Sequence, residues 1–243
     1  MERSMPTLKF TTNESPLKKF EIRPLTLAYR EEATKLVTEV FVTSEPLVAY
    51  LGSKPENMKP LIEFLVKRSI EDGLGVMVVD LDTAEIAFVM IIIDNYQSDI
   101  PPHILEEKHC EVVLNFLDEC YKDELIQQLS QKPFSCINFI AIASPSKYRE
   151  IGIGEKFLAW TMHEHPLIKQ ANALVGVTTH PKSRTLVTKA GWKVRKITKI
   201  SEYTNSNGEK PFNDFEEVME KKLGLKRHDG AHLVTYLKKQ ANL

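Results

Sequence analysis

The chain has 243 residues and a formal net charge of −1, with 42% hydrophobic and 27% charged residues. This length and composition indicate a globular protein of one large or two small domains, and they exclude a disordered chain. The near-zero charge, without a dense basic cluster, argues against a nucleic-acid partner. No apolar run reaches membrane-spanning length, which argues against a membrane partner.

The cysteines and histidines give no pattern typical of a metal site. Cys110, Cys120 and Cys136 are odd in number and lack metal-binding spacing, so we expect free thiols in a reducing compartment. The histidines are scattered along the chain, and we expect no metal ligand set. His163 and His165 are two residues apart on a predicted helix, and we place both at the surface. The N-terminal residues lack an apolar signal core, which predicts a cytoplasmic protein.

The first third of the chain predicts a short strand and two amphipathic helices. Residues 1–17 are polar, and we expect a flexible tail before a single domain at residues 18–243. Residues 19–25 alternate apolar and polar side chains up to a proline, which predicts a short strand. Apolar residues recur at helical spacing in residues 26–41 and 57–70, which predicts two helices that each bury one face.

The middle of the chain predicts a hairpin and then an interruption of the sheet. Residues 76–81 and 86–93 are apolar runs joined by a short polar turn, which indicates an antiparallel pair. Residues 95–134 contain a loop and then helical periodicity from Val112 to Leu129. This insertion is either a covering helix with a solvated face or part of the wall of a substrate site. The pattern does not decide between them.

The segment from Ile137 to Thr161 has the pattern of a buried strand, a glycine-bearing turn and a helix. Free N–H groups at a helix N-terminus, with glycines that let a ligand approach the backbone, form an anion site. The fingerprints G-x-x-x-x-G-K-[ST] and G-x-G-x-x-G both fail here. The alternative is an ordinary strand-to-helix connection whose glycines allow close packing.

The order R-x-x-G-x-G from Arg149 to Gly154, between strand and helix, resembles the pyrophosphate loop of the GCN5-related N-acetyltransferases (GNAT). The resemblance implies acetyl-CoA as co-substrate. It also implies an α/β (α+β) GNAT fold, in which helices flank a twisted, mixed but mostly antiparallel sheet of about seven strands, with a helical insertion before the cofactor strand. The residues it implies for cofactor binding are Ile142, Ala143, Ser144, Arg149, Glu150, Ile151, Gly152, Ile153, Gly154, Glu155 and His180.

Glu45 follows the first predicted helix and precedes Pro46, which disfavours a helical conformation for the residue before it. From its position alone, Glu45 is either a solvated loop glutamate or a candidate base. An aromatic residue followed closely by Ser-Glu-Pro-Leu is similar to the arylalkylamine N-acetyltransferases of insects and related invertebrates. This resemblance implies that Glu45 is a general base that acts on the amine through water.

Residues 171–178 predict the next strand, and the segment from His180 to Trp192 resembles the family's N-x-x-A/S-x-x-L-Y/F-x-K-x-G-F/Y element. The matching residues are Ser183, Leu186, Lys189, Gly191 and Trp192. His180 stands where the family usually has asparagine. Val187 stands where many relatives have a tyrosine that acts as general acid, so the proton for the leaving thiolate must come from elsewhere.

Thr179 and Ser183 fall where the invertebrate enzymes have two serines with supporting catalytic roles. The resemblance therefore implies catalytic roles for both hydroxyl groups, with threonine in place of one serine. The alternative for Ser183 is a helix-start hydroxyl that satisfies backbone N–H groups.

Residues 193–203 and 231–237 predict the last two strands, separated by a polar loop, and the resemblance covers about residues 18–240. It implies an acetyl-CoA-dependent N-acetyltransferase that acts on a small primary amine, an arylalkylamine or a polyamine, as a monomer or weak dimer. The amine attacks directly with a glutamate as base. The alternatives are a protein or peptide N-acetyltransferase and a non-catalytic acyl-CoA-binding module, which Val187 permits.

Overall fold

The computed structural model describes residues 20–94, 100–149, 151–225 and 230–237. The predicted tail at residues 1–17 and the predicted cofactor residue Glu150 lie outside these ranges.

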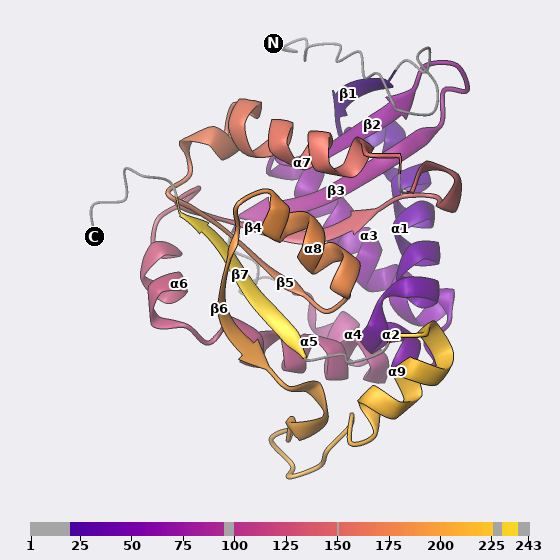
Figure 1. The fold of residues 1–243 in the computed structure, drawn as a ribbon, viewed down its shortest axis with the longest axis vertical. Coiled ribbons are helices and arrows are strands. Elements are labelled where there is room, and N and C mark those ends of the chain that lie inside the picture. Colours follow the sequence, from indigo (N-terminus) through magenta and orange to yellow (C-terminus); the bar gives the residue numbers. More distant parts are fainter. Residues whose placement is uncertain (1–19, 95–99, 150, 226–229, 238–243) are drawn as a thin grey trace.

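A seven-stranded sheet in the order β1-β2-β3-β4-β5-β7-β6 forms the centre of the described chain (Figure 1). All neighbouring strands run antiparallel except β4 and β5, which are parallel. This confirms the predicted fold class. The strands are β1 Phe20–Pro24, β2 Val76–Asp80, β3 Ile86–Asp94, β4 Cys136–Ala143, β5 Ala173–Thr178, β6 Lys193–Thr198 and β7 Ala231–Leu237.

Helices cover both faces of the sheet, because the strands bury apolar side chains on each side. Helices α1, α2, α3, α5 and α9 pack in one core cluster, and α7 and α8 pack in the other, on the opposite face (Figure 1). The helices are α1 Arg30–Ser44, α2 Pro46–Tyr50, α3 Pro55–Glu71, α4 Pro102–Leu105, α5 Lys108–Tyr121, α6 Glu124–Leu129, α7 Ile153–Glu164, α8 Pro181–Lys189 and α9 Phe215–Leu223.

A bulge in β4 changes which face its side chains occupy. The register with β3 shifts between Ile91 and Ile92, which leaves Ile140 as the extra residue on β4. Phe139, before the bulge, packs in the cluster with α7 and α8, whereas Ala141, two residues on, packs in the cluster with α1 and α3. Without the bulge, residues two apart would share one face.

The parallel pairing of β4 and β5 is short, and it ends where a site begins. It runs from Cys136 opposite Ala173 to Phe139 opposite Gly176. The strands approach closely at this last pair, since a Cβ on Gly176 would lie 3.0 Å from the Phe139 carbonyl oxygen. Beyond it, β4 pairs only with β3 and β5 only with β7, so the two strand ends separate.

Several elements differ from the sequence-based expectation. The single helix predicted from Val112 to Leu129 is two helices, α5 and α6, because Asp123 caps a new helix by accepting the Ile126 N–H. The short helix α2 was not predicted. The expected polar loop before β7 contains α9, whose apolar side chains Phe215, Val218 and Met219 are in fact spaced for a helix.

His165 corrects a surface assignment. His163 is exposed as expected, but His165, just after α7, is only 2% exposed. Its Nδ1 accepts a hydrogen bond from the Ile168 N–H at 3.3 Å. Because burial disfavours the charged ring, the pKa of His165 falls to about 4.

Candidate active site

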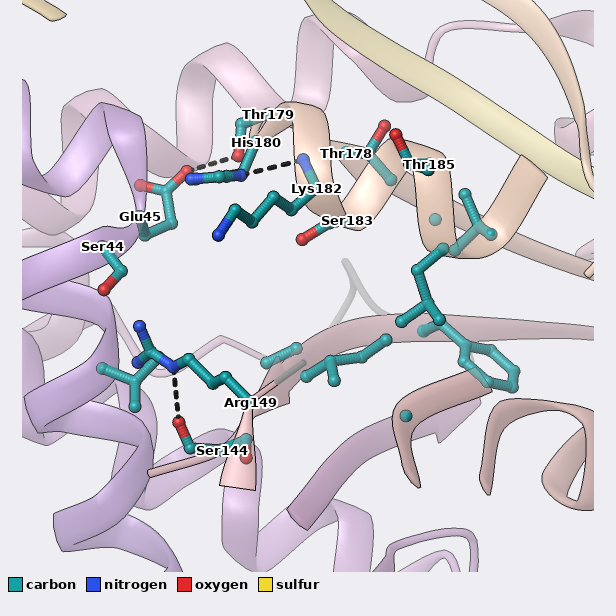
Figure 2. Close-up of a pocket in the computed structure, with 18 of the residues that line it drawn as sticks. Ser44, Glu45, Ser144, Arg149, Thr178, Thr179, His180, Lys182, Ser183 and Thr185 are labelled. Atoms are coloured by element: carbon teal, nitrogen blue, oxygen red, sulfur yellow. Dashed lines mark hydrogen bonds between the residues drawn. The ribbon is translucent and has the colours of Figure 1, made fainter. Parts of the chain in front are cut away.

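A cavity of about 820 Å³ opens between the separated ends of β4 and β5. Its lining comes from both strands, the C-terminal end of α1, the N-terminal ends of α7 and α8, and the end of α9. Figure 2 shows Ser44 and Glu45 on one side, the first turn of α8 above, and Arg149 with Ser144 across the open space. Elements far apart in sequence therefore meet in one cavity.

The N-terminus of α7 and its glycines line this cavity. Gly152 caps the helix with a φ of +80°, a left-handed conformation that favours glycine. A Cβ on Gly154 would lie 2.9 Å from Cζ of Phe88, so this glycine allows the helix to approach that ring. The first N–H groups of a helix have no partner within that helix, and this end of α7 lines the cavity, which suits an anion such as a pyrophosphate.

Side chains beside the loop fix its position. The Ser144 hydroxyl donates to the Ala87 carbonyl oxygen at 2.8 Å, and Nε of Arg149 donates to the Ser144 carbonyl oxygen at 3.0 Å. Two of the predicted cofactor residues do not line the cavity: Ala143 is buried in the core, and Ile151 packs beside the other cluster. The predicted cofactor residues that do line it are Ile142, Ser144, Arg149, Gly152, Ile153, Gly154, Glu155 and His180.

Glu45 lies at the break between α1 and α2, in the extended conformation that Pro46 requires. One carboxylate oxygen accepts the Val48 N–H at 2.7 Å and so caps α2, and the other accepts the Thr179 hydroxyl at 2.6 Å. Both oxygens are therefore held in place. The solvated-loop alternative is wrong for this residue, which lines the cavity and contacts a residue 134 positions later.

The surroundings of Glu45 shift its pKa upwards. Removal of the carboxyl group from water is the largest influence and raises the pKa above its ordinary value. Hydrogen bonds from Thr179, Val48 and Leu47 oppose this shift because they stabilise the charged form. A carboxylate with a raised pKa is a better proton acceptor near neutral pH than a solvated one.

The first turn of α8 supplies the remaining polar groups. His180 caps this helix, with its Nδ1 accepting the Lys182 N–H at 3.0 Å, the role that a capping asparagine plays. Ser183 lines the cavity beside Lys182, as Figure 2 shows. Val187 is buried on the α7 side of the sheet, although it also touches the cavity. It offers no proton.

The insertion before β4 does not contribute to the cavity wall in its described part. Residues 100–134 supply no lining side chain, and α5 instead packs in the core with α3. Leu223, Gly224 and Leu225, at the end of α9, line the cavity. In residues 100–134 the insertion therefore packs as a covering element, and the end of α9, a helix not predicted from the sequence, lines the cavity instead.

The described residues show two further features. They bring together no group of three or more His, Cys, Asp or Glu side chains that could hold a metal ion. Among the described helices, none has both the length and the apolar character needed to cross a membrane.

Solved structures resemble this arrangement along almost the whole chain. The C-terminal condensation domain of Ebony in complex with β-alanyl-dopamine is 18% identical, with a TM-score of 0.73 over 91% of this chain and 100% of that one. A mosquito arylalkylamine N-acetyltransferase like 5b is also 18% identical, with a TM-score of 0.70 over 90% of this chain and 100% of that one. The chain has the GNAT fold. This confirms the fold that the R-x-x-G-x-G loop implied.

A polyamine N-acetyltransferase of Drosophila melanogaster, which forms N-acetylagmatine, shares the GNAT fold at 14% identity, with a TM-score of 0.68 over 90% of this chain and 100% of that one. The sequence itself matches no protein-family model and no curated protein sequence. At these identities the likeness extends to the fold, and the chemistry has to be argued from the site.

Proposed function

We propose that the protein is an acetyl-CoA-dependent N-acetyltransferase for small primary amines, either arylalkylamines or polyamines. The observation that carries the proposal is one cavity that holds both an anion site and a fixed carboxylate. The α7 N-terminus with Gly152 and Gly154 provides the first, and Glu45 hydrogen-bonded to Thr179 provides the second. Solved structures with the same fold include N-acetyltransferases for both kinds of amine.

The cofactor site is proposed at the gap between β4 and β5. The pyrophosphate lies at the N-terminus of α7, beside Gly152, Ile153 and Gly154. The amide-bearing arm of acetyl-CoA lies along residues 140–142 of β4, which line the cavity and have no strand partner in β5. These residues fit the cofactor because they line the cavity where β4 no longer pairs with β5.

Glu45 is the proposed base. An alkylamine has a pKa close to that of lysine, about 10, and is therefore mostly protonated at neutral pH. Glu45 takes a proton from the ammonium group through a water molecule, and the free amine attacks the acetyl carbonyl carbon. The carbon–nitrogen bond forms, the attacking nitrogen loses a second proton to water as the amide forms, and the carbon–sulfur bond breaks, which releases the thiolate of CoA. Thr179 holds the carboxylate of Glu45 in position, and Ser183 offers a hydroxyl nearby.

Val187 cannot protonate the thiolate, and the chemistry does not require a strong acid there. A thiol has a pKa of about 8.5, so the thiolate is a stable leaving group near neutral pH. Water in the open cavity or the Ser183 hydroxyl completes the transfer by supplying a proton. This assignment separates the protein from relatives that use a tyrosine at this position.

The test is release of free thiol from acetyl-CoA against tryptamine, tyramine, dopamine, spermidine and a lysine peptide. Turnover with a small amine and not with the peptide is the expected result. Turnover with the peptide alone would replace the substrate class by a protein substrate. If no compound of the panel causes thiol release but acetyl-CoA still raises the melting temperature, catalysis is contradicted. The protein is then better explained as an acyl-CoA-binding module.

A further inference from the structure

The C-terminal end of α9 forms one wall of the cavity, and it does so with apolar side chains. Leu223 and Leu225 both line the cavity and flank Gly224, which ends the helix with a φ of +65°. The left-handed turn at Gly224 allows the chain to reverse, so that a leucine on each side of it reaches the cavity. Both leucines are partly buried against the core that contains α1 and α2.

α9 is fixed to α2, the short helix that Glu45 caps. The Tyr50 hydroxyl donates a hydrogen bond to the Asp214 carboxylate, and the Lys222 ammonium donates to the Ala49 carbonyl oxygen at 3.1 Å. The Tyr50 ring lies 5.5 Å from the Phe212 ring, measured between centroids. Figure 1 shows the end of α9 beside α2. The two leucines are therefore on the Glu45 side of the cavity, where the acceptor amine must bind.

The charges and apolar groups on this side indicate what the wall accommodates. Val40 and Phe41 of α1 line the same cavity and extend its apolar surface. In the described lining, carboxylates come from Glu45 and Glu155 only, and the Glu155 carboxylate is 3.9 Å from the Lys189 ammonium. A polyamine brings at least two ammonium groups, and each needs a partner when it leaves water. One fixed carboxylate beside an apolar wall suits an amine with one ammonium group and an apolar body.

We propose that Leu223 and Leu225 limit the size of the apolar body of the acceptor amine. This inference rests on the proposed function, since it concerns the acceptor side of the same site. Replacement of either leucine by alanine removes three carbon atoms from the wall and enlarges the space next to Glu45. Hydrophobic walls discriminate between bodies that differ by a few carbon atoms by about tenfold or more.

The experiment compares 2-phenylethylamine with the bulkier 2,2-diphenylethylamine. Both carry one ammonium group and differ only in the size of the body. The dissociation constants are measured by calorimetry with CoA bound, and thiol release is measured separately with acetyl-CoA. The proteins are the wild type, Leu223→Ala, Leu225→Ala and the matched control Val218→Ala. Val218 is a partly buried residue of α9 that packs in the core and does not line the cavity.

We expect the wild type to prefer 2-phenylethylamine. In Leu223→Ala and Leu225→Ala the ratio of the two dissociation constants should shift by about tenfold or more towards the larger amine. Val218→Ala should keep the wild-type ratio. An unchanged ratio in both alanine variants, an equal shift in the control, or no binding of either amine to any protein would overturn the inference. Binding with the expected size dependence but without thiol release would support the size limit set by the two leucines and contradict the proposed acetyl transfer.

Discussion

Glu45 links three parts of the chain, because it ends α1, caps α2 and accepts a hydrogen bond from Thr179 after β5. Its surroundings shift its pKa in opposite directions. Burial raises its pKa, and the hydrogen bonds lower it. The carboxylate is thus neither free to move nor fully stabilised in its charged form, which suits its proposed role as a base.

Glu45→Gln should reduce kcat/KM by about a hundredfold to ten-thousandfold, the usual contribution of general base catalysis. The introduced amide can still accept the Val48 N–H through its oxygen and can donate its N–H to the Thr179 hydroxyl, so the fold is kept. The wild-type rate should fall with decreasing pH as Glu45 becomes protonated, at a pH above the ordinary carboxyl range, and the variant should lack this dependence. A pH profile of kcat/KM checks it. Full turnover of the variant from pH 6 to pH 9 would contradict the assignment.

Stability gives a control for this substitution that does not depend on activity. Because the pKa of Glu45 is raised in the folded state, folding favours the protonated form, and this contribution is lost as the pH rises through the folded pKa. Glu45→Gln should therefore melt at a higher temperature than the wild type near pH 8. The difference should vanish below about pH 4, where the unfolded carboxyl group is also protonated. Loss of activity together with this gain excludes misfolding as the cause.

His165 gives a pH dependence of stability that is opposite to that of Glu45. Its pKa of about 4 lies below the ordinary histidine value, so its contribution to stability is present above about pH 6.5 and lost as the pH falls towards 4. This loss amounts to roughly 3 kcal/mol of unfolding free energy. His165→Asn keeps an acceptor for the Ile168 N–H and cannot titrate, so unfolding curves between pH 7 and pH 4 should show a smaller decrease. The exposed His163→Asn is the control and should behave like the wild type.

Among the elements, the start of α7 combines a backbone requirement with the proposed pyrophosphate site. Gly152→Ala places a side chain at a φ of +80°, which costs roughly 1–2 kcal/mol of unfolding free energy. The strained cap should also raise the KM for acetyl-CoA. Gly208→Ala is a matched control, since Gly208 has a φ of +79° and open space around it, and it lies in a turn outside the cavity lining.

Denaturation curves should show a similar loss of stability for both glycine variants. Acetyl-CoA kinetics should show a raised KM for Gly152→Ala alone. Equal effects of the two variants on the KM would mean that the α7 cap has no special relation to the cofactor.

Elements with strong local signals were predictable from the sequence. The apolar run of β4, the glycines at the start of α7 and the proline after Glu45 each fix the backbone within a few residues, and the structure agrees with them. The bulge at Ile140 was not predictable, because it depends on the register with β3. It directly follows Phe139, the last residue of β4 that pairs with β5, and so lies where the cavity opens.

The parts of the site that depend on contacts between distant segments also could not be predicted from local sequence patterns. The contact between Tyr50 and Asp214 joins residues 164 positions apart, and it brings α9 to the cavity. The helical spacing of α9 was present in the sequence, but nothing local indicated that its last residues would face Glu45. The burial of His165 likewise depends on packing around the end of α7, with the Trp160 ring edge-on at 6.4 Å between centroids.

For the whole molecule, the proposed cofactor joins the two halves of the sheet, so its binding should appear in global stability. At a concentration one hundred times its dissociation constant, a ligand of the folded state adds about 2.7 kcal/mol. For a chain of this length, that corresponds to a rise in melting temperature of about 5–10 °C. Thermal denaturation with acetyl-CoA should show this rise, and adenosine, which lacks both pyrophosphate and arm, should not. Equal effects of the two compounds would contradict the proposed site.

The separation of β4 from β5 also gives the protein an edge strand inside its sheet. Exposed strand edges invite pairing with other chains, and proteins usually protect the outermost strands against it. Here residues 140–142 have no strand partner in β5, but they line a cavity together with the first turns of α7 and α8. Under the proposed function, this edge pairs with the slender arm of acetyl-CoA, which carries two amide groups, and not with another polypeptide strand. The fold thus keeps this strand edge inside a cavity, where it is protected from pairing with other chains.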